Sequence, residues 1–367
     1  MPTGGANVLD GYKSPRLTVP YATEKPVIDG TINDDEWQHA ASLNALQTLR
    51  GQVAPRQTRF WVLWDEDNLY MAMRSPLRPG ERPLQRQRRR DRETANLVFD
   101  DSYEIWLDTK AKDPKTGLDC YFQFLSNPAG KPYDTMHLPT VGNSRRGYNT
   151  NWVPANRITP DGKAWEWELV IPRESIFFNK PFADGYEFGC LLARTYQRPF
   201  NQNAIGAISS FSAVEVYPRF RLSKTAPAVQ LLNVCDFENQ TFGLHLAATG
   251  HNDQKANWQI QADDFKKTGT LTLQKDQVAT TEPMLDLLKP AKKKPFRITV
   301  TNEAGEVLLD WASQRQFGNR QIPTEAINDP ADKVRLSPSF NPVHDYVRVV
   351  GDFIDFNRRD DIADVLI

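Results

Sequence analysis

Carboxylates, amides and aromatic rings recur at alternate positions of two neighbouring segments, 102–108 and 121–127. The side chains of a β-strand alternate between its two faces, so an apolar face turned to a core leaves these groups together on the other face. Carboxylates and amides bond hydroxyl groups, while a ring covers the C–H face of a sugar. The pattern therefore favours a polyol ligand. The polar positions are Ser102, Glu104, Trp106, Asp108, Tyr121, Gln123 and Asn127.

Three further residues extend the predicted site. Glu168 lies opposite the apolar face formed by Trp165 and Trp167, which we expect in the core. Trp152 stands in a polar loop where no core periodicity requires a ring, and loops on sandwich scaffolds carry binding residues. The alternative for Trp152 is that it folds back and closes one end of the sandwich. We predict one carbohydrate-binding surface made of Glu104, Trp106, Gln123, Trp152, Glu168 and Arg194.

Paired carboxylates raise the question of catalysis. Glycoside hydrolysis uses two carboxyl groups roughly 5–10 Å apart, and Glu104 and Glu168 meet this requirement if they face one another across a sheet. Ordinary sandwiches contain such pairs, and no sequence feature marks a raised pKa or a deep cleft. We therefore predict that the region binds sugar without catalysing its hydrolysis.

Two ligand alternatives remain open at this point. Asp65 and Asp67 place carboxylate oxygens in one tight turn, which is compatible with calcium, although turn chemistry alone explains them. A haem-binding sandwich would use Met71, Met73 or His137 as axial ligands. Methionines at alternating apolar positions are more typical of a core.

Composition excludes several classes of protein. The 367 residues carry a formal net charge of −1, which gives no field favouring nucleic acid or an anionic membrane. We expect no membrane insertion, because no apolar run approaches the roughly 20 residues of a spanning helix. The N-terminus has no hydrophobic stretch of a signal peptide. The three cysteines and five histidines are scattered and form no recognisable metal motif.

Short alternating runs separated by turn residues predict an all-β chain of antiparallel sandwiches. A helical turn is expected at 34–41, with Asn33 or Asp34 as its N-cap, and a hairpin turn at 302–306. The predicted divisions are an N-terminal arm or linker at 1–24, a first β-sandwich at 25–225, an immunoglobulin-like sandwich at 226–318, a linker at 319–342, and the start of a truncated third β-domain at 343–367.

Four motifs in order carry a family resemblance. They are PVIDGTINDDEW (26–37), LWDEDNLYMAMR (63–74), RRDRETANLVFDDSYEIWLD (89–108) with YFQFLSNPAGKPYD (121–134), and AWEWELVIPRESI (164–176) with FGCLLART (188–195). Together they resemble the family 9 carbohydrate-binding modules, over about Lys25 to Leu222.

The resemblance implies a sugar-binding β-sandwich, with structural calcium in some members and glycoside hydrolase domains as frequent neighbours. Its polar positions carry over to Glu104, Asp91, Glu168 and Arg194. It also implies an extracellular or periplasmic location.

The predicted function is non-catalytic binding of a polysaccharide or glycan end. The chain would be an accessory region of a larger carbohydrate-degrading protein acting on O-glycosyl compounds, with a covalently linked catalytic domain outside this sequence. The main alternative is a structural or adhesion array of β-domains that binds no sugar.

Overall fold

The computed structural model describes residues 7–78, 80–86, 96–145, 147–197 and 200–318. Within them the regular structure is almost entirely β-strand, which confirms the all-β prediction. The predicted linker at 319–342, the third β-domain at 343–367 and Asp91 lie outside the described residues. In the described part, no helix has the length and apolar character needed to cross a membrane.

The first part of the chain, 7–225, supplies most of the elements, with η denoting a 3-10 helix. These are β1 (Arg16–Pro20), α1 (Asp34–Trp37), β2 (Ala41–Leu43), β3 (Gln47–Thr48), β4 (Gln52–Val53), β5 (Arg59–Trp64), β6 (Asn68–Pro76), η1 (Asn96–Phe99), β7 (Ser102–Lys112), β8 (Asp119–Ser126), β9 (Pro132–Leu138), η2 (Pro139–Val141), β10 (Asn143–Arg145), β11 (Val153–Ile158), β12 (Ala164–Pro172), η3 (Arg173–Ile176), β13 (Glu187–Gln197), β14 (Phe200–Ala204), η4 (Val214–Val216) and β15 (Arg219–Ser223).

The second part, 226–318, adds strands only. These are β16 (Ala228–Asp236), β17 (Thr241–Thr249), β18 (Gln254–Ala262), β19 (Phe265–Leu273), β20 (Val278–Thr280), β21 (Met284–Leu288), β22 (Pro295–Asn302) and β23 (Val307–Phe317).

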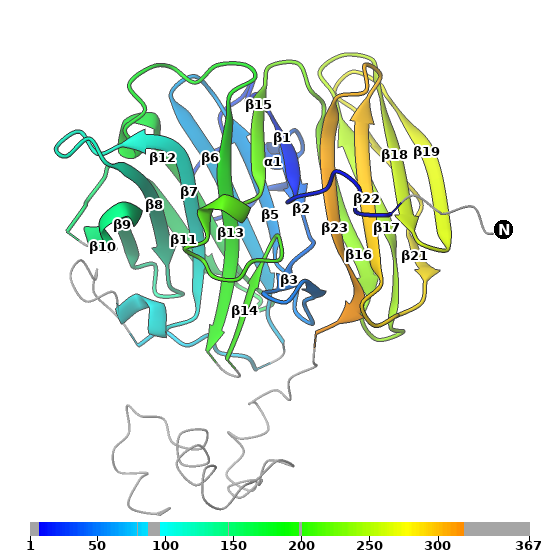
Figure 1. The fold of residues 1–367 in the computed structure, drawn as a ribbon, viewed down its shortest axis with the longest axis horizontal. Helices are drawn as coiled ribbons and strands as arrows, with labels where there is room; N and C mark the ends of the chain where they lie inside the picture. Colours follow the sequence, from blue (N-terminus) through cyan, green and yellow to red (C-terminus); the bar gives the residue numbers. More distant parts are fainter. Residues whose placement is uncertain (1–6, 79, 87–95, 146, 198–199, 319–367) are drawn as a thin grey trace, which may run out of the picture. The chain divides into compact units, whose positions relative to one another are not determined.

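Two layers of sheet run through both parts (Figure 1). One sheet has the strand order β10-β9-β8-β7-β13-β14-β3-β4-β23-β22-β18-β19. The other has the order β11-β12-β6-β5-β2-β16-β17-β20, with β21 also paired to β17. Each sheet buries its inner face against the other, because alternate strand residues are apolar.

Strand β12 shows how alternation positions the core. Trp165, Trp167, Leu169 and Ile171 are fully buried between the sheets, which confirms the expected placement of both tryptophans. The same core contains Met71 and Met73 of β6, whose partners on β12 are Leu169 and Trp167.

Local signals in the sequence correctly mark several boundaries. The carboxamide of Asn33 accepts a hydrogen bond from the backbone N–H of Asp35 and caps α1. The hairpin between β22 and β23 closes with a bond from Asn302 N–H to Glu306 O, and Gly305 supplies the positive φ of the turn. The three cysteines are buried free thiols.

Strand β1 joins the two parts of the chain. It pairs in parallel with β15 and antiparallel with β23, and Figure 1 shows it between these strands. Both sheets contain strands from both parts, so strand pairing continues from the first part into the second within the described residues of 7–318. The division at 225/226 and the immunoglobulin-like assignment of 226–318 remain predictions.

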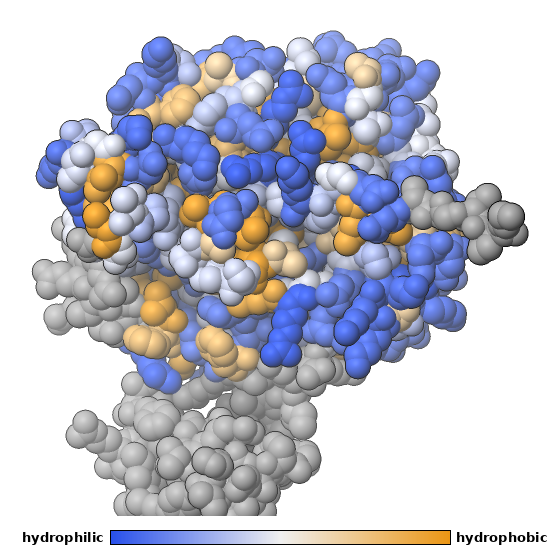
Figure 2. Space-filling model, in the orientation of Figure 1, coloured by the Kyte–Doolittle hydropathy of each residue, from blue (hydrophilic) through white to orange (hydrophobic). Residues whose placement is uncertain are grey.

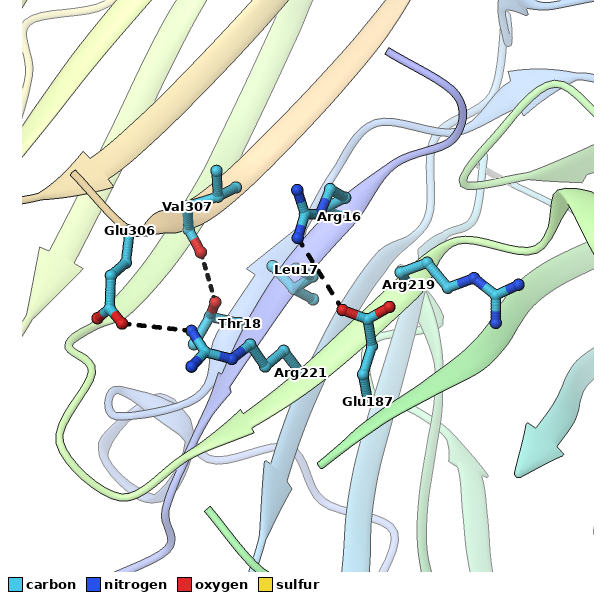
Figure 3. Close-up of a pocket in the computed structure, with 8 residues that line it drawn as sticks. All are labelled: Arg16, Leu17, Thr18, Glu187, Arg219, Arg221, Glu306 and Val307. Carbon is cyan, nitrogen blue, oxygen red and sulfur yellow. Dashed lines mark hydrogen bonds and ion pairs between the residues drawn. The ribbon is translucent and has the colours of Figure 1, made fainter. Parts of the chain in front are cut away.

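A surface pocket of about 190 Å³ lies beside β1 (Figure 3). Two ion pairs lie beside it, Arg16 with Glu187 at 4.0 Å and Arg221 with Glu306 at 3.5 Å, and the second of them joins the two parts of the chain. The hydroxyl of Thr18 donates to the carbonyl of Val307 at 2.6 Å. No aromatic residue lines this pocket, so it lacks a platform for a sugar ring. Its polar contacts instead hold the two parts of the chain together.

Candidate functional site

A buried carboxylate lies at the centre of the candidate site. Glu104 on β7 is 4% exposed, and its Oε1 accepts hydrogen bonds from Ser102 Oγ at 3.2 Å and Thr195 Oγ1 at 3.1 Å. Its Oε2 accepts from Trp106 Nε1 at 3.1 Å and Gln123 Nε2 at 3.0 Å. Burial raises the pKa of Glu104, and the four hydrogen bonds oppose this shift.

Trp106 and Gln123, which donate to Glu104, lie beside a stack of rings nearer the surface. His137 of β9 stacks on Tyr121 at 4.8 Å and on Trp106 at 5.0 Å between ring centroids. Its Nε2 lies 3.3 Å from Gln123 Oε1, and its Nδ1 lies 2.8 Å from the exposed hydroxyl of Ser144. A continuous polar path therefore connects the buried carboxylate to the surface.

The segment 205–217 borders this stack. Phe211 approaches Trp106 edge to face at 6.1 Å between centroids, and both Phe211 and His137 are partly exposed. Figure 2 shows a mostly hydrophilic surface with a small apolar patch near the centre of the view. The partly buried Val214 and Val216 pack against the apolar cluster that contains Trp106 and Tyr121. We call the following set the His137 surface: Trp106, Tyr121, Gln123, His137, Ser144 and Phe211.

Glu168 lies on the other sheet and does not join the His137 surface. It is fully buried on β12, where its carboxylate accepts from Trp37 Nε1 at 2.9 Å and from the backbone N–H groups of Gly30 at 2.9 Å and Asp29 at 3.3 Å. Burial raises its pKa to about 7 against the lowering effect of these donors. The prediction of a shared face is wrong here, because β7 and β12 turn their polar sides in opposite directions.

Arg194 points into the interior rather than toward the His137 surface. Its guanidinium packs over Tyr196 at 3.9 Å and Trp165 at 4.8 Å, and it pairs with Asp101 at 3.3 Å. The next residue, Thr195, is the one that faces Glu104. Alternation along β13 therefore removes Arg194 from the site and supplies a hydroxyl instead.

Trp152 lies within the core, as the alternative interpretation expected. It is 6% exposed and packs edge to face against Trp167 at 5.9 Å and Phe124 at 5.2 Å. Of the six predicted residues the structure thus brings together Glu104, Trp106 and Gln123.

Sequence reasoning considered His137 only as a candidate haem ligand, and it missed Phe211. The register of β8 and β9 pairs Tyr121 with His137, so extending the alternating polar face by one strand would have found the histidine. Met71 and Met73, the other axial ligands considered for a haem, lie in the core of the sandwich and not on this surface. Phe211 follows no strand pattern and gives no such signal.

The aspartates considered for calcium are engaged by protein donors. Asp65 accepts from the backbone N–H groups of Asp67 and Asn68, from the hydroxyl of Tyr70 at 2.7 Å and from Lys25 Nζ at 2.8 Å. Asp67 accepts from the guanidinium of Arg173 at 3.0 Å. This arrangement is that of a turn held by hydrogen bonds, and it offers no set of six oxygens.

Comparison with known protein families finds a match in the first part of the chain. Residues 28–128 match the family model described as carbohydrate family 9 binding domain-like, so the chain contains a region of this kind. The matched residues include Glu104, Trp106, Tyr121 and Gln123. The match confirms the predicted resemblance for these residues. None of the curated proteins compared with the chain matches it.

Three solved structures illustrate the relatives. A family 9 carbohydrate-binding module from Caldicellulosiruptor kristjanssonii in complex with cellotriose is 14% identical over 57% of this chain and 95% of that chain, with a TM-score of 0.39. The module from that organism in complex with glucose is 14% identical over 57% and 97%, with a TM-score of 0.37. A candidate carbohydrate-binding protein from Bacteroides uniformis is 11% identical over 57% and 97%, with a TM-score of 0.42.

Proposed function

Because residues 28–128 belong to a carbohydrate family 9 binding domain-like region, we propose that the chain binds a polysaccharide or glycan end at the His137 surface. Binding would not be accompanied by catalysis. The observation that carries this proposal is the stack of Trp106, Tyr121 and His137 beside the amide of Gln123. Rings with a few placed polar groups are the usual composition of small-ligand sites.

Each component of the His137 surface has a distinct role in this proposal. The partly exposed side chains of His137 and Phe211 would contact the C–H face of a sugar ring, while the hydroxyl of Ser144 would bond its hydroxyl groups. Trp106 and Tyr121 support the imidazole from below. Aromatic contacts of this kind contribute on the order of 1 kcal/mol each.

Glu104 acts as a positioning residue rather than as a direct acceptor. Both of its oxygens are already engaged by four protein donors, so a sugar hydroxyl would have to displace one of them. Its effect on the ligand passes through Trp106 and Gln123, which it fixes in place. This differs from the direct role expected for Glu104 from the sequence.

The wider context follows from the family type. We propose that the chain is an accessory region of a larger carbohydrate-degrading protein, linked to a catalytic domain and located outside the cytoplasm. The division into a sugar-binding part at 25–225 and an immunoglobulin-like part at 226–318 belongs to this proposal. The structural array without sugar binding is the alternative that the following experiment separates.

The test is a glycan array followed by affinity electrophoresis of the full chain and its variants. His137→Ala and Phe211→Ala should each lower affinity for the bound glycan roughly fivefold or more. Phe99→Ala is the matched control, because Phe99 is 61% exposed on η1 and does not belong to the His137 surface. Absence of glycan binding by the wild-type chain, or equal affinity of all three variants, would overturn the proposal.

A further inference from the structure

A cluster of metal-binding side chains lies away from the His137 surface. His39, His251 and Asp276 each offer a donor atom, and these atoms all lie within 4.8 Å of one another. The two imidazole rings stack with centroids 4.6 Å apart, and Nδ1 of His251 lies 3.4 Å from Oδ1 of Asp276. The three residues come from separate segments of the sequence, so no motif of closely spaced ligands predicts the cluster.

Backbone contacts fix the position of each donor. His39 follows α1, where the side-chain amide of Gln230 donates to the carbonyls of Trp37, Gln38 and Ala40 at 3.1–3.2 Å. This ties the His39 segment to β16 of the second part of the chain.

The two turns that carry the other donors are also joined. His251 lies between β17 and β18, and Asp276 lies between β19 and β20. The backbone N–H of Asp276 donates to Gly250 O at 2.8 Å, and the N–H of Lys275 donates to Asp253 Oδ1 at 2.9 Å. The donors are therefore held near one another before any ligand arrives.

One ring nitrogen of His39 makes no hydrogen bond within the described part of the fold. Nδ1 of His39 is buried and has no hydrogen-bond partner among the described residues. Buried polar atoms in folded proteins are nearly always bonded, so an unpartnered ring nitrogen on a residue of this cluster is compatible with a ligand.

We propose that His39, His251 and Asp276 form a binding site for a divalent transition metal, with Zn²⁺ as the representative ion. Two imidazoles and one carboxylate match the ligand preference of zinc and leave a fourth tetrahedral position for water. Calcium does not fit, because it requires six or more oxygens. Donor atoms around zinc are about 3.3 Å apart, so small side-chain movements complete the site.

The site would join the two parts of the chain. His39 belongs to the first part, whereas His251 and Asp276 belong to the second. A bound ion therefore crosslinks the α1 segment to the turns of the second part and stabilises the folded state by mass action. This role is independent of sugar binding.

The test is isothermal titration of the full chain with Zn²⁺, together with the visible absorption of Co²⁺ as a report on the ligand geometry. The wild-type chain should bind one ion at this site, and His39→Ala and His251→Ala should each weaken binding at least about tenfold. His245→Ala is the matched control, because His245 lies on β17 outside the cluster, and it should bind as the wild type does.

Asp276→Asn provides the variant that keeps the fold. Asp276 adopts a positive φ of 56°, a conformation that asparagine tolerates, so the change removes charge without straining the turn. It should lose zinc affinity and the zinc-induced rise in melting temperature while its metal-free melting temperature stays at the wild-type value. No binding at millimolar Zn²⁺, or wild-type affinity in His39→Ala, His251→Ala and Asp276→Asn, would overturn the proposal.

Discussion

In residues 7–225, the outer faces of the two sheets carry similar groups that have different roles. Glu104 on β7 and Glu168 on β12 are both buried, and each accepts a hydrogen bond from an indole N–H, that of Trp106 at 3.1 Å and that of Trp37 at 2.9 Å. The remaining donors differ. The other donors to Glu168 are backbone N–H groups. Glu104 instead accepts from side chains, and one of these, Gln123, also contacts His137 nearer the surface.

The covering segment accounts for this difference. Gly30 has a φ of 88°, and a Cβ there would lie 3.2 Å from the backbone nitrogen of Asn156, so the segment before α1 packs tightly onto the sheet. On the opposite face, the segment 205–217 leaves His137 and Phe211 partly exposed. A closed face stabilises the fold, and an open face presents rings and amides to a ligand.

The largest expected effect lies on the closed face. Trp37→Ala should lower the free energy of unfolding by about 3–5 kcal/mol, because it leaves a cavity and removes a donor from Glu168. Urea denaturation measures this loss. Sugar affinity of the folded variant should match that of the wild type; a reduced affinity would show that the two faces are coupled.

Glu168 should also make stability depend on pH. Its folded pKa of about 7 lies above the ordinary value of 4.5, so its stabilising contribution is present below about pH 4.5 and is lost as pH rises through 7. The shift corresponds to about 3 kcal/mol. Glu168→Gln should flatten the curve of unfolding free energy against pH between these limits. An unchanged slope would assign the dependence to other groups.

On the open face, Glu104→Gln should lower both stability and affinity. The new amide group no longer accepts two of the four hydrogen bonds, which costs about 1–3 kcal/mol in denaturation experiments. Affinity falls because Trp106 and Gln123 lose their fixed orientation. Glu168→Gln serves as the matched control with wild-type affinity. Equal glycan binding by Glu104→Gln and the wild type would remove Glu104 from the site.

The smallest effect is expected for Trp106→Phe. The smaller ring still supports His137 but no longer donates to Glu104, so the free energy of unfolding should fall by about 1 kcal/mol. Glycan affinity should fall less than in Glu104→Gln, as affinity electrophoresis of the two variants side by side will show. A larger loss of affinity would mean that the indole itself contacts the sugar.

The sequence alone determined the features that depend on a few neighbouring residues, namely strand alternation, a helix cap and a turn. Alternation predicted the all-β class and the inward placement of Trp165 and Trp167, and it brought Glu104, Trp106 and Gln123 onto one face. Asn33 as a helix cap and the turn before Glu306 were readable for the same reason. A strand or turn fixes its side-chain directions within a few residues.

Only the tertiary structure decided which polar face closes and which remains open. Glu168 and Glu104 are alike in the sequence pattern, but one meets the segment around Gly30 and the other meets Thr195 and Gln123. Trp152 packs in the core, because Trp167 on β12 provides an apolar neighbour.

The meeting of His39 with the turn at His251 likewise depends on the docking of the second part of the chain. Contacts of this kind join residues more than a hundred positions apart. They follow from how the sheets stack, which local periodicity does not encode.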